Sequence, residues 1–393
     1  MKIVHVITRL ILGGAQENTL ITCRLLAERG HDVTLITGPA LGPEGQLFDA
    51  AQADDYEVIV VDKMRRAIHP YYDAVSYWTV KKLIAGIEPD IVHTHSAKAG
   101  IVGRYAAHSL KGRWGGDLPQ VVHTIHGLAF HPYQSRLLYN LYVAIEKRAA
   151  RRTDAFLSVA DVMNEKTVAA GIGVGKEFTT AYSAIEEEDY LEKPDPESVS
   201  DFRRKYGISE QAVVITCIAR LAELKGHEYI IESAKRLAHL YPDCIWLFVG
   251  DGNLSEAIKR QIQMANLSYK FRFTGMLKPS QIPLALHASD ILVHCSLREG
   301  LARVLPQAML AGKPAISFDI DGAKEVVNET TGRLVDAEDV DAFTDACEEL
   351  IRDKDLRVRL GKAGREFVRD RFAPDTMVDT IEGVYRRLIS KTK

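Results

Sequence analysis

The chain has 393 residues, of which 46% are hydrophobic and 26% are charged, and its formal net charge is −3. The length predicts two or three domains, and the composition is that of an ordinary globular protein with a sizeable core. A charge balance this close to neutrality excludes a global attraction to polyanions, so we expect no nucleic-acid partner.

The cysteines and the apolar segments indicate the cellular compartment. Five cysteines are dispersed along the chain without a CxxC pair, so neither a zinc site nor a disulfide framework is expected. The apolar start is interrupted by His5 and Arg9, which is not the pattern of a signal peptide. No apolar stretch approaches the ~18 residues that span a bilayer. We therefore expect a cytoplasmic protein that meets a membrane only peripherally.

Short β-branched runs alternate with longer helical patterns, which indicates the α/β class, with parallel sheets covered by helices on both faces. The strands expected in the first half are 2–7, 32–36, 57–61, 90–93, 121–124, 155–159 and 178–182. Ligands of such sheets bind beyond the carboxyl ends of the strands. The loops that directly follow the strands are therefore the places to look for chemistry.

Gly13 and Gly14 follow the first strand and lead into a helix. Glycines let the backbone come close to a ligand, and the free amides of a helix start attract anions. The spacing is not GxGxxG, so a nicotinamide or flavin site loses its main support. Taken alone, the pair is equally typical of a plain strand-to-helix turn.

Acidic residues and two prolines replace the apolar periodicity after residue 185, as in an exposed connection. We therefore expect a first domain at 1–185, a linker at 186–208 and a second domain at 209–372. The strands expected in the second domain are 213–218, 244–249, 271–274, 291–294, 315–318 and 332–335.

Two cations, Arg220 and Lys225, follow strand 213–218. A guanidinium fork and a point charge together suit a diphosphate. A random pair of cations would more often be solvated surface residues, but the position after a strand favours a site. Gly250 and Gly275 follow the next two strands, where a glycine either admits a nucleobase or makes a turn.

Glu299 lies between strand 291–294 and a following helix, and its neighbours offer backbone N–H groups. A carboxylate at this position can accept hydrogen bonds from sugar hydroxyls while the amides face phosphate or sugar oxygens. The alternative is that Glu299 only caps the helix.

Together, these segments resemble the family 4 retaining glycosyltransferases. Their fold, GT-B, has two Rossmann-like parallel-sheet domains that face each other across a cleft. The resemblance covers essentially the whole chain. It is carried by residues 13–15, 93–95 and 124–127, Arg220 with Lys225 and Gly226, residues 250–252 and 273–275, and the segment 299–314.

The resemblance implies roles for individual residues. Arg220 and Lys225 are expected to hold the donor diphosphate. Glu299 is expected to bind the transferred sugar, with help from the backbone of Gly300 and Leu301.

Further contacts to the donor are implied for the glycines after the other strands, namely Gly13, Gly14, Gly250 and Gly275. His126 matches the family histidine that lies against the donor sugar and the acceptor route, and a packed or turn histidine is its alternative.

His93, His95 and Lys98 are candidates for acceptor contact, and Ser96 is a candidate cap for the helix that contains Lys98.

Gln307 departs from the family pattern, which has a second glutamate eight positions after the first to bind the donor ribose. An amide still hydrogen-bonds ribose hydroxyls, but without the charge-assisted strength of a carboxylate. We expect nucleotide binding to be retained but altered.

The function implied is hexosyl transfer with retention, from a UDP- or GDP-sugar to a glycan or lipid-linked acceptor, in the synthesis of cell-surface polysaccharide or glycoconjugate. Arg220 and Lys225 can stabilise the departing diphosphate, so no metal or other cofactor is expected. The Asp319–Ile320–Asp321 sequence is read as a loop bordering the donor pocket, and a metal-holding pair is its alternative. Two other functions stay open, a nucleotide-sugar epimerase and a catalytically silent sugar-nucleotide-binding subunit.

Two further segments indicate contacts beyond the donor. Segment 133–152 has apolar residues at helical spacing and five cations, so it either lies on anionic lipid or packs on its own sheet. Trp114 is a second candidate membrane anchor. Segment 373–393 contains an amphipathic helix that, by the resemblance, crosses back to the first domain.

Overall fold

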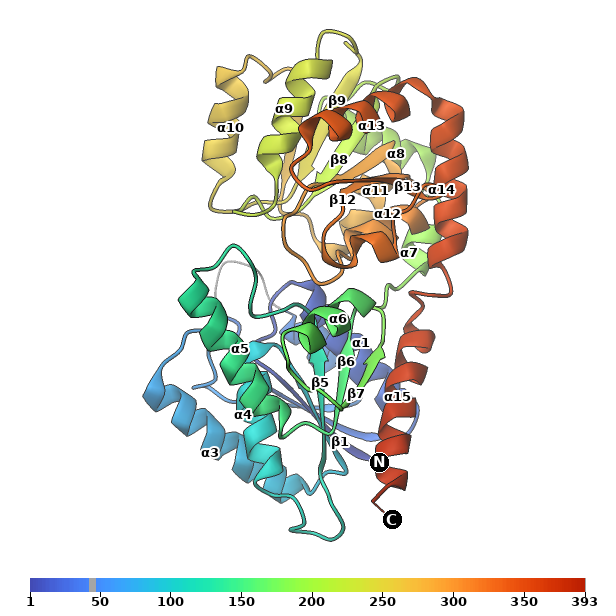
Figure 1. Cartoon of the computed structure of the whole chain (residues 1–393). Coiled ribbons are helices and arrows are strands. Elements are labelled where there is room, and N and C mark those ends of the chain that lie inside the picture. Colours follow the sequence, from blue (N-terminus) through green and yellow to red (C-terminus); the bar gives the residue numbers. More distant parts are fainter. Residues whose placement is uncertain (42–46, 393) are drawn as a thin grey trace. The chain divides into compact units, whose positions relative to one another are not determined.

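The computed structural model describes residues 1–41 and 47–392. The chain divides into two compact units, and Figure 1 shows both as layers of helix and sheet. Unit 1 contains Met1–Ala184 and Pro374–Lys393, and unit 2 contains Ile185–Ala373.

Unit 1 is built on a seven-stranded parallel sheet with the order β3-β2-β1-β4-β5-β6-β7. Its strands are β1 (Lys2–Ile7), β2 (Asp32–Thr37), β3 (Glu57–Val60), β4 (Ile91–His95), β5 (Gln120–Ile125), β6 (Ala155–Ser158) and β7 (Glu177–Thr180). The order reverses between β1 and β4, so the loops after these two strands flank the topological switch point where ligands of such sheets bind.

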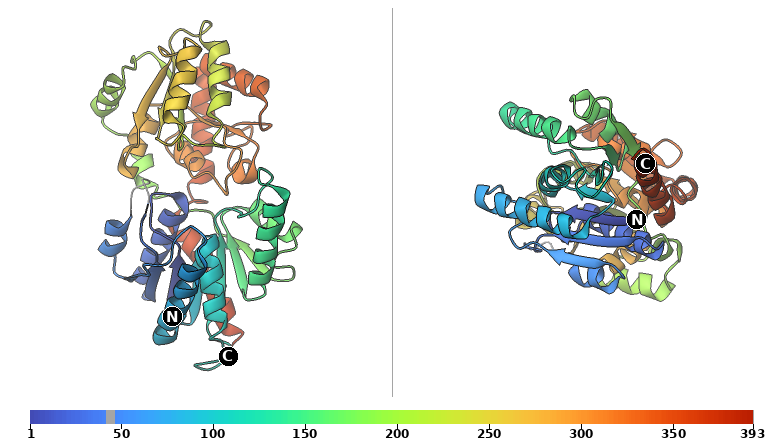
Figure 2. Two further views of the ribbon diagram at one scale, coloured as in Figure 1. Left: turned by 90° about the vertical axis from the view of Figure 1, so that its left-hand side faces the viewer. Right: turned by 90° about the horizontal axis from the view of Figure 1, so that it is seen from below.

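Helices cover both faces of this sheet (Figure 2). They are α1 (Gly14–Glu28), α2 (Phe48–Ala53), α3 (Pro70–Ile87), α4 (Ala97–His108), α5 (Arg136–Ala150), α6 (Asp161–Ala169) and α15 (Pro374–Ser390). Side chains alternate along β1: Ile3 and Ile7 pack with α1 and α15, whereas Val4 and Val6 pack with α3 and α4. The sheet is therefore buried on both faces, as expected for parallel strands.

Unit 2 repeats the same topology with six parallel strands in the order β10-β9-β8-β11-β12-β13. They are β8 (Val213–Ile218), β9 (Cys244–Val249), β10 (Phe271–Gly275), β11 (Ile291–His294), β12 (Ala315–Phe318) and β13 (Gly332–Val335). The helices are α7 (Glu188–Leu191), α8 (Pro196–Lys205), α9 (His227–Leu237), α10 (Ser255–Met264), α11 (Ile282–His287), α12 (Val304–Leu310), α13 (Val340–Arg352) and α14 (Lys354–Val368). The switch point lies between β8 and β11.

The predicted α/β class with two Rossmann-like sheets is confirmed, and the expected strands agree with the observed ones to within two residues at their ends. Segment 186–208 contains α7 and α8, and Phe202 of α8 packs into the core of unit 2. None of the described helices is long and apolar enough to cross a bilayer.

Helix α15 belongs to unit 1 although it ends the chain. Its apolar face is buried with α1 through Met377, Val378, Ile381, Val384, Tyr385 and Leu388. On its polar face, Arg29 contacts Asp375, Asp379 and Glu382 at 2.6–3.2 Å. The helix is therefore part of the core of unit 1.

Ending the chain at Phe372 is expected to lower stability and activity together. Six buried apolar side chains would leave the core, and each contributes about 1.5–3 kcal/mol, a total comparable to the whole stability of a domain. Thermal unfolding and turnover measure the effect. A chain ending at Ser390 keeps α15 and is the matched control; equal melting temperatures for both truncations would contradict the prediction.

Candidate active site

The loops after β8 and β11 meet at the switch point of unit 2, and the backbone sets their distance. Gly226 adopts φ 69°, and a Cβ atom there would lie 2.0 Å from the carbonyl oxygen of Cys295. The amide of Leu297 donates to the carbonyl of Leu224 at 2.9 Å. Only glycine permits this approach, which brings Lys225 beside Glu299.

Glu299 lies in a cluster of opposite charge. Its carboxylate accepts a hydrogen bond from the Lys225 ammonium, and its Oε1 lies 3.6 Å from Nε2 of His294. The Glu299 side chain is 23% exposed and that of Lys225 is 19% exposed. Burial by itself raises the pKa of the Glu299 carboxyl, but Lys225 and His294 more than offset this, so the pKa lies well below its ordinary value. Glu299 is therefore a carboxylate at any working pH.

The loop that carries Glu299 is held by the loop after β12. The Glu299 amide donates to Oδ2 of Asp321 at 2.8 Å, and the Gly322 amide donates to the Gly300 carbonyl at 3.0 Å. Asp321 has φ 46°, an uncommon conformation that this contact helps to hold. One carboxylate of the DxD sequence therefore positions the site residue, whereas Asp319 is exposed.

Several polar groups around Glu299 are open to a ligand. Arg220 is exposed, and its guanidinium makes no hydrogen bond or ion pair within residues 1–41 and 47–392. In the same described part of the chain, the amides of Gly300 and Leu301 and the side chain of Gln307 find no partner. A guanidinium, an ammonium and two amides beside a carboxylate suit an anionic sugar derivative.

Gly250 and Gly275 lie beside this group and pair with each other. The Gly250 amide donates to the Gly275 carbonyl at 3.0 Å, and a Cβ on Gly250, at φ 134°, would lie 2.1 Å from the Ala219 carbonyl. Gly275 has open space where a Cβ would point. The structure therefore gathers the ends of β8, β9 and β10 around the loop that carries Arg220.

In unit 1, Gly13 and Gly14 lie at the carboxyl end of β1, beside β4. Gly13 is the residue before α1 and has extended backbone, and α1 begins at Gly14, which is exposed. The start of α1 thus faces the switch point with its first amides, as an anion site requires.

The expected capping of α4 by Ser96 is wrong. The Ser96 hydroxyl bonds Oγ1 of Thr8 at 2.7 Å, and it is Thr8 that accepts from the Ala99 amide, at 3.1 Å. Thr8 directly follows β1, so sequence separation concealed this contact.

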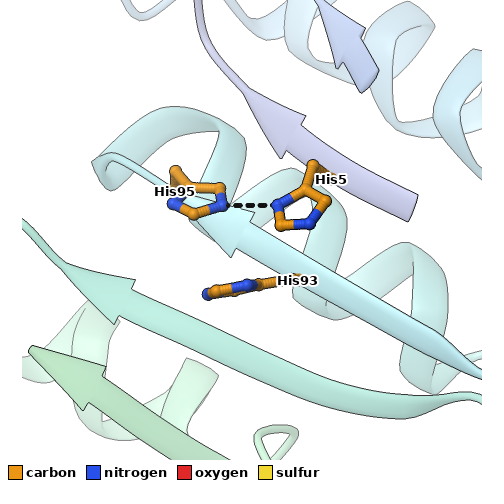
Figure 3. Close-up of side chains that lie close together, drawn as sticks. All are labelled: His5, His93 and His95. Atoms are coloured by element: carbon orange, nitrogen blue, oxygen red, sulfur yellow. Dashed lines mark hydrogen bonds between the residues drawn. The ribbon is translucent and has the colours of Figure 1, made fainter. Parts of the chain in front are cut away.

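A chain of imidazoles runs through the same end of the sheet. His5 of β1 is paired with His93 of β4, and Figure 3 shows their rings close together with that of His95. His5 Nδ1 lies 2.9 Å from His95 Nε2, and His95 Nδ1 lies 3.0 Å from His126 Nε2. His93 hydrogen-bonds Tyr385 at 2.5 Å and Thr124 at 2.6 Å. Within the described residues, only Nε2 of His5 in this trio lacks a partner.

The hydrogen-bond partners and the burial of these rings together indicate which ring nitrogens carry protons. Burial lowers the pKa of His5 to about 3, and burial followed by neighbouring histidines holds the pKa values of His93 and His95 well below 6.5, so all three rings are neutral. Buried N–H groups without acceptors are rarer than unused acceptors, so His5 keeps its proton on Nδ1 and donates to His95. His95 then donates to His126, whose own proton is left on Nδ1.

His5, His93 and His95 are also the one group of three or more metal-ligating side chains gathered in the described residues. Two imidazole nitrogens on one tetrahedral zinc, at 2.0–2.1 Å from the metal, lie about 3.3 Å apart. The observed 2.9 Å between His5 and His95 fits a hydrogen bond better. The donor set is therefore explained by hydrogen bonds without an ion.

His126 lines a small cavity of about 50 Å³ with His123, Gly127 and Phe130. The other acceptor candidates are placed differently. His93 is buried, and both of its ring nitrogens have hydrogen-bond partners. The Lys98 ammonium donates to Asp73 at 2.5 Å and to the Ala67 carbonyl at 2.9 Å. Trp114 packs against the core formed by α3 and α4, so it is not an exposed membrane anchor.

Sequence reasoning missed His294 and Asp321 as neighbours of Glu299. His294 ends β11 and was treated only as the last residue of a strand. Asp321 was expected in a loop that borders the donor pocket, with a metal-holding pair as the alternative, but not as a partner of the Glu299 amide. Its position directly after β12, next to β11 in the sheet, was the signal that could have indicated a contact.

Comparison with known proteins is consistent with this geometry. Residues 198–367 match the family model for glycosyl transferases group 1, and residues 13–177 match that for the glycosyl transferase 4-like domain.

Relatives match over nearly the full length. The chain is 30% identical over 390 residues to the UDP-Gal:alpha-D-GlcNAc-diphosphoundecaprenol alpha-1,3-galactosyltransferase of Escherichia coli, covering 98% of this chain and 96% of that protein. It is 23% identical to the N-acetyl-alpha-D-glucosaminyl L-malate synthase of Bacillus anthracis, covering 94% and 92%.

Among solved structures, Anabaena Alr3699/HepE in complex with UDP-glucose superposes with a TM-score of 0.80 at 20% identity, covering 98% of this chain and 100% of that one. Similarity at this level shows the fold.

The two doubly wound sheets have the GT-B fold. The chain belongs to the family 4 glycosyltransferases.

Proposed function

We propose that this protein transfers a hexosyl group, with retention and without a metal ion, from a UDP-sugar to a saccharide carried on a lipid diphosphate. The observation that carries the proposal is the Lys225–Glu299 pair at the switch point, together with the exposed Arg220 and the amides of Gly300 and Leu301, which have no hydrogen-bond partner among the described residues. The Escherichia coli relative is named for a UDP-sugar donor and a diphosphoundecaprenol acceptor, which supports both substrate classes.

Arg220 and Lys225 would receive the donor diphosphate. As the bond between the anomeric carbon and the phosphate oxygen breaks, negative charge grows on the leaving diphosphate, and fixed cations lower the energy of that state. Lys225 would exchange part of its contact with Glu299 for the phosphate. A divalent metal is then not needed for charge neutralisation, and the use of the Asp321 carboxylate by the Glu299 amide agrees with this.

Glu299 would accept hydrogen bonds from hydroxyls of the transferred sugar and would oppose the positive charge that develops at the anomeric carbon. An acceptor hydroxyl would attack from the face that the diphosphate leaves, forming the new bond from carbon to oxygen. Its proton would pass to the departing phosphate oxygen, which balances the reaction without a separate base. Gln307 would bind the ribose hydroxyls through its amide.

His126 would contribute a hydrogen bond to the sugar or acceptor in addition to its contact with His95. Gly13 and Gly14, at the start of α1, would supply amides to the donor phosphates.

Helix α5 supports peripheral docking on an anionic bilayer. Of its residues, only Ala149 and Ala150 are buried, whereas Leu137 is 82% exposed and Leu141 is 52% exposed. The neighbouring cations, Arg136, Lys147, Arg148 and Arg151, are exposed as well. An apolar face beside cations suits anionic headgroups, and docking would bring a lipid-linked acceptor to the enzyme.

The test of the proposal is a panel of UDP-, GDP- and ADP-sugars, each with and without a polyprenyl diphosphate saccharide and with EDTA present throughout. We expect selective binding of a UDP-sugar, slow hydrolysis without acceptor, and transfer with the anomeric configuration kept. Loss of turnover in EDTA that divalent metal restores would sink the metal-free mechanism. Conversion of the donor to its epimer would point to an epimerase.

Replacing Leu137 and Leu141 by aspartate is expected to weaken binding to vesicles that contain phosphatidylglycerol by at least tenfold, because the apolar contact is lost and like charge is added. Co-sedimentation measures the binding. Leu240 of unit 2 is 63% exposed, so Leu240→Asp is the matched control. Equal vesicle binding by both variants would show that α5 is not the docking surface. Donor hydrolysis should stay unchanged in both.

A further inference from the structure

Unit 2 also contains a basic cavity that does not include Glu299, Lys225 or Arg220. Its volume is about 640 Å³, and its charged lining consists of Lys193, Lys313, Lys362, Arg365 and a single carboxylate, Glu210. Lys313 lies just before β12, at the amino end of the sheet, whereas Glu299 follows β11 at the carboxyl end. The amino ends of parallel strands lie opposite their carboxyl ends, so this cavity is separate from the site around Glu299.

The cations of this cavity are not neutralised by the protein. No ion pair is formed by Lys193, Lys362 or Arg365 with any of the residues in 1–41 and 47–392. Nε of Arg365 is buried and has no hydrogen-bond partner there. A buried donor without an acceptor lowers the stability of the fold by about 1–3 kcal/mol. A bound ligand that accepts a hydrogen bond from Nε of Arg365 would recover this free energy.

Gly312 shapes the cavity. Its φ is 73°, and a Cβ there would lie 3.0 Å from the Arg365 guanidinium. The absence of a side chain therefore lets the planar guanidinium lie directly against the backbone before Lys313.

Lys313 experiences the crowding of like charge. Its ammonium donates to the His287 carbonyl at 3.1 Å. The pKa of Lys313 is lowered to about 8, first by burial, and then by Arg203, Arg365 and Lys193, against the opposing effect of Asp290. Asp290 is itself paired with Arg203 at 3.2 Å. The fold thus retains an uncompensated cluster of cations around an open volume.

We propose that this cavity binds a phosphate-bearing anion of at least two charges. The volume is that of a small-ligand site, a guanidinium with two or three ammonium groups is the usual set for phosphate oxygens, and Pro194, Val199 and Val358 give one apolar wall. Both a free oligophosphate and a phospholipid headgroup have this chemistry. The site does not depend on the proposed transfer reaction.

The experiment titrates the full chain by calorimetry with inorganic pyrophosphate at pH 7, in saturating UDP so that the donor site is filled. We expect one further binding event. Lys362→Ala should weaken it about tenfold or more, equivalent to one charge-assisted hydrogen bond. Arg365→Ala should weaken it at least as much. Lys225→Ala, titrated in the same way, should keep the event and thereby distinguish it from the donor site.

The matched control is Lys354→Ala, which removes an exposed cation from the same helix, α14, outside the cavity. If Lys354→Ala and Lys362→Ala weaken binding equally, or if no binding is found, the inference is overturned. Vesicles that contain phosphatidic acid, whose phosphomonoester headgroup can carry two charges, form the second arm: binding that Lys362→Ala weakens assigns the headgroup as ligand, whereas pyrophosphate binding alone assigns a free phosphate.

The pH dependence gives an independent readout. The anion binds best when Lys313 is protonated, so its affinity should fall as the pH rises from 7 to 9 through the pKa of about 8. Lys313→Arg should keep binding but remove most of that fall. A flat profile in the wild-type chain would contradict the role of Lys313.

Discussion

Glu299→Gln is expected to lower kcat by at least about a hundredfold while UDP still binds. The amide keeps the volume and some hydrogen bonds of the carboxylate but not the charge that opposes the developing positive charge at the anomeric carbon, and losses of a preorganised electrostatic partner are typically of 10²–10³. UDP lacks the sugar, so its affinity should change little or increase, because Lys225 is released from its pair with Glu299. Single-turnover transfer and UDP calorimetry measure the two effects.

Asp319→Asn is the matched control, since it removes an exposed carboxylate from the adjacent loop without touching the Lys225 pair. We expect it to keep nearly full activity. If the two variants lose activity equally, the loop rather than the Glu299 charge is responsible. If Glu299→Gln loses UDP binding together with turnover, the residue holds the site together and does not act on the sugar.

Lowering the pH from 7 to 5 is expected to remove a large part of the stability of unit 1. His5, His93, His95 and His123 are buried and neutral, with pKa values depressed from 6.5, that of His5 to about 3. The unfolded chain takes up protons below about pH 6.5 and the native unit does not, so stability falls with falling pH. At pH 5, each ring that stays neutral in the native unit lowers the free energy of unfolding by about 2 kcal/mol. The total stability of a domain is about 5–15 kcal/mol.

The histidine contribution is separable from that of the carboxylates. Depressed carboxyl pKa values, as for Glu382 at about 2, cost stability only below about pH 4.5. His5→Asn removes one titrating ring, while its amide can take the place of Nδ1–H toward His95, so its loss of stability between pH 7 and pH 5 should be smaller by about 2 kcal/mol. His239 is exposed, and His239→Gln should leave the loss unchanged. Denaturant unfolding at pH 7 and pH 5 measures the loss of unfolding free energy. An equal loss in His5→Asn and wild type would refute the account.

The sequence predicted the strands closely because parallel strands buried on both faces are continuous apolar runs that end in glycines and charges. The rule that ligands bind at strand ends then indicated the loops of Arg220, Lys225 and Glu299. Contacts between loops were not predictable in the same way. Two examples are the hydrogen bonds from the Glu299 amide to Asp321 and from the Ala99 amide to Thr8. Both depend on which strands are neighbours in the sheet, and local periodicity does not predict strand order.

The histidines illustrate a second limit. His93 and His95 were expected to contact the acceptor because they follow a strand, where ligands of such sheets bind. In the structure both lie within β4 and share one of its faces. That face is turned to α15, a helix almost three hundred residues further along the chain, and the Tyr385 hydroxyl hydrogen-bonds His93. A side chain's face is predictable from the strand, but the element that covers it is not.

The close approach of Gly226 to Cys295 has a consequence for how this enzyme can diverge. The distance between the Lys225 and Glu299 loops is set by main chain against main chain, so substitutions that reshape the pocket for another nucleobase or another hexose leave it unaltered. A substitution of a side chain such as that of Gln307 is therefore expected to leave the spacing of Lys225 and Glu299 unchanged.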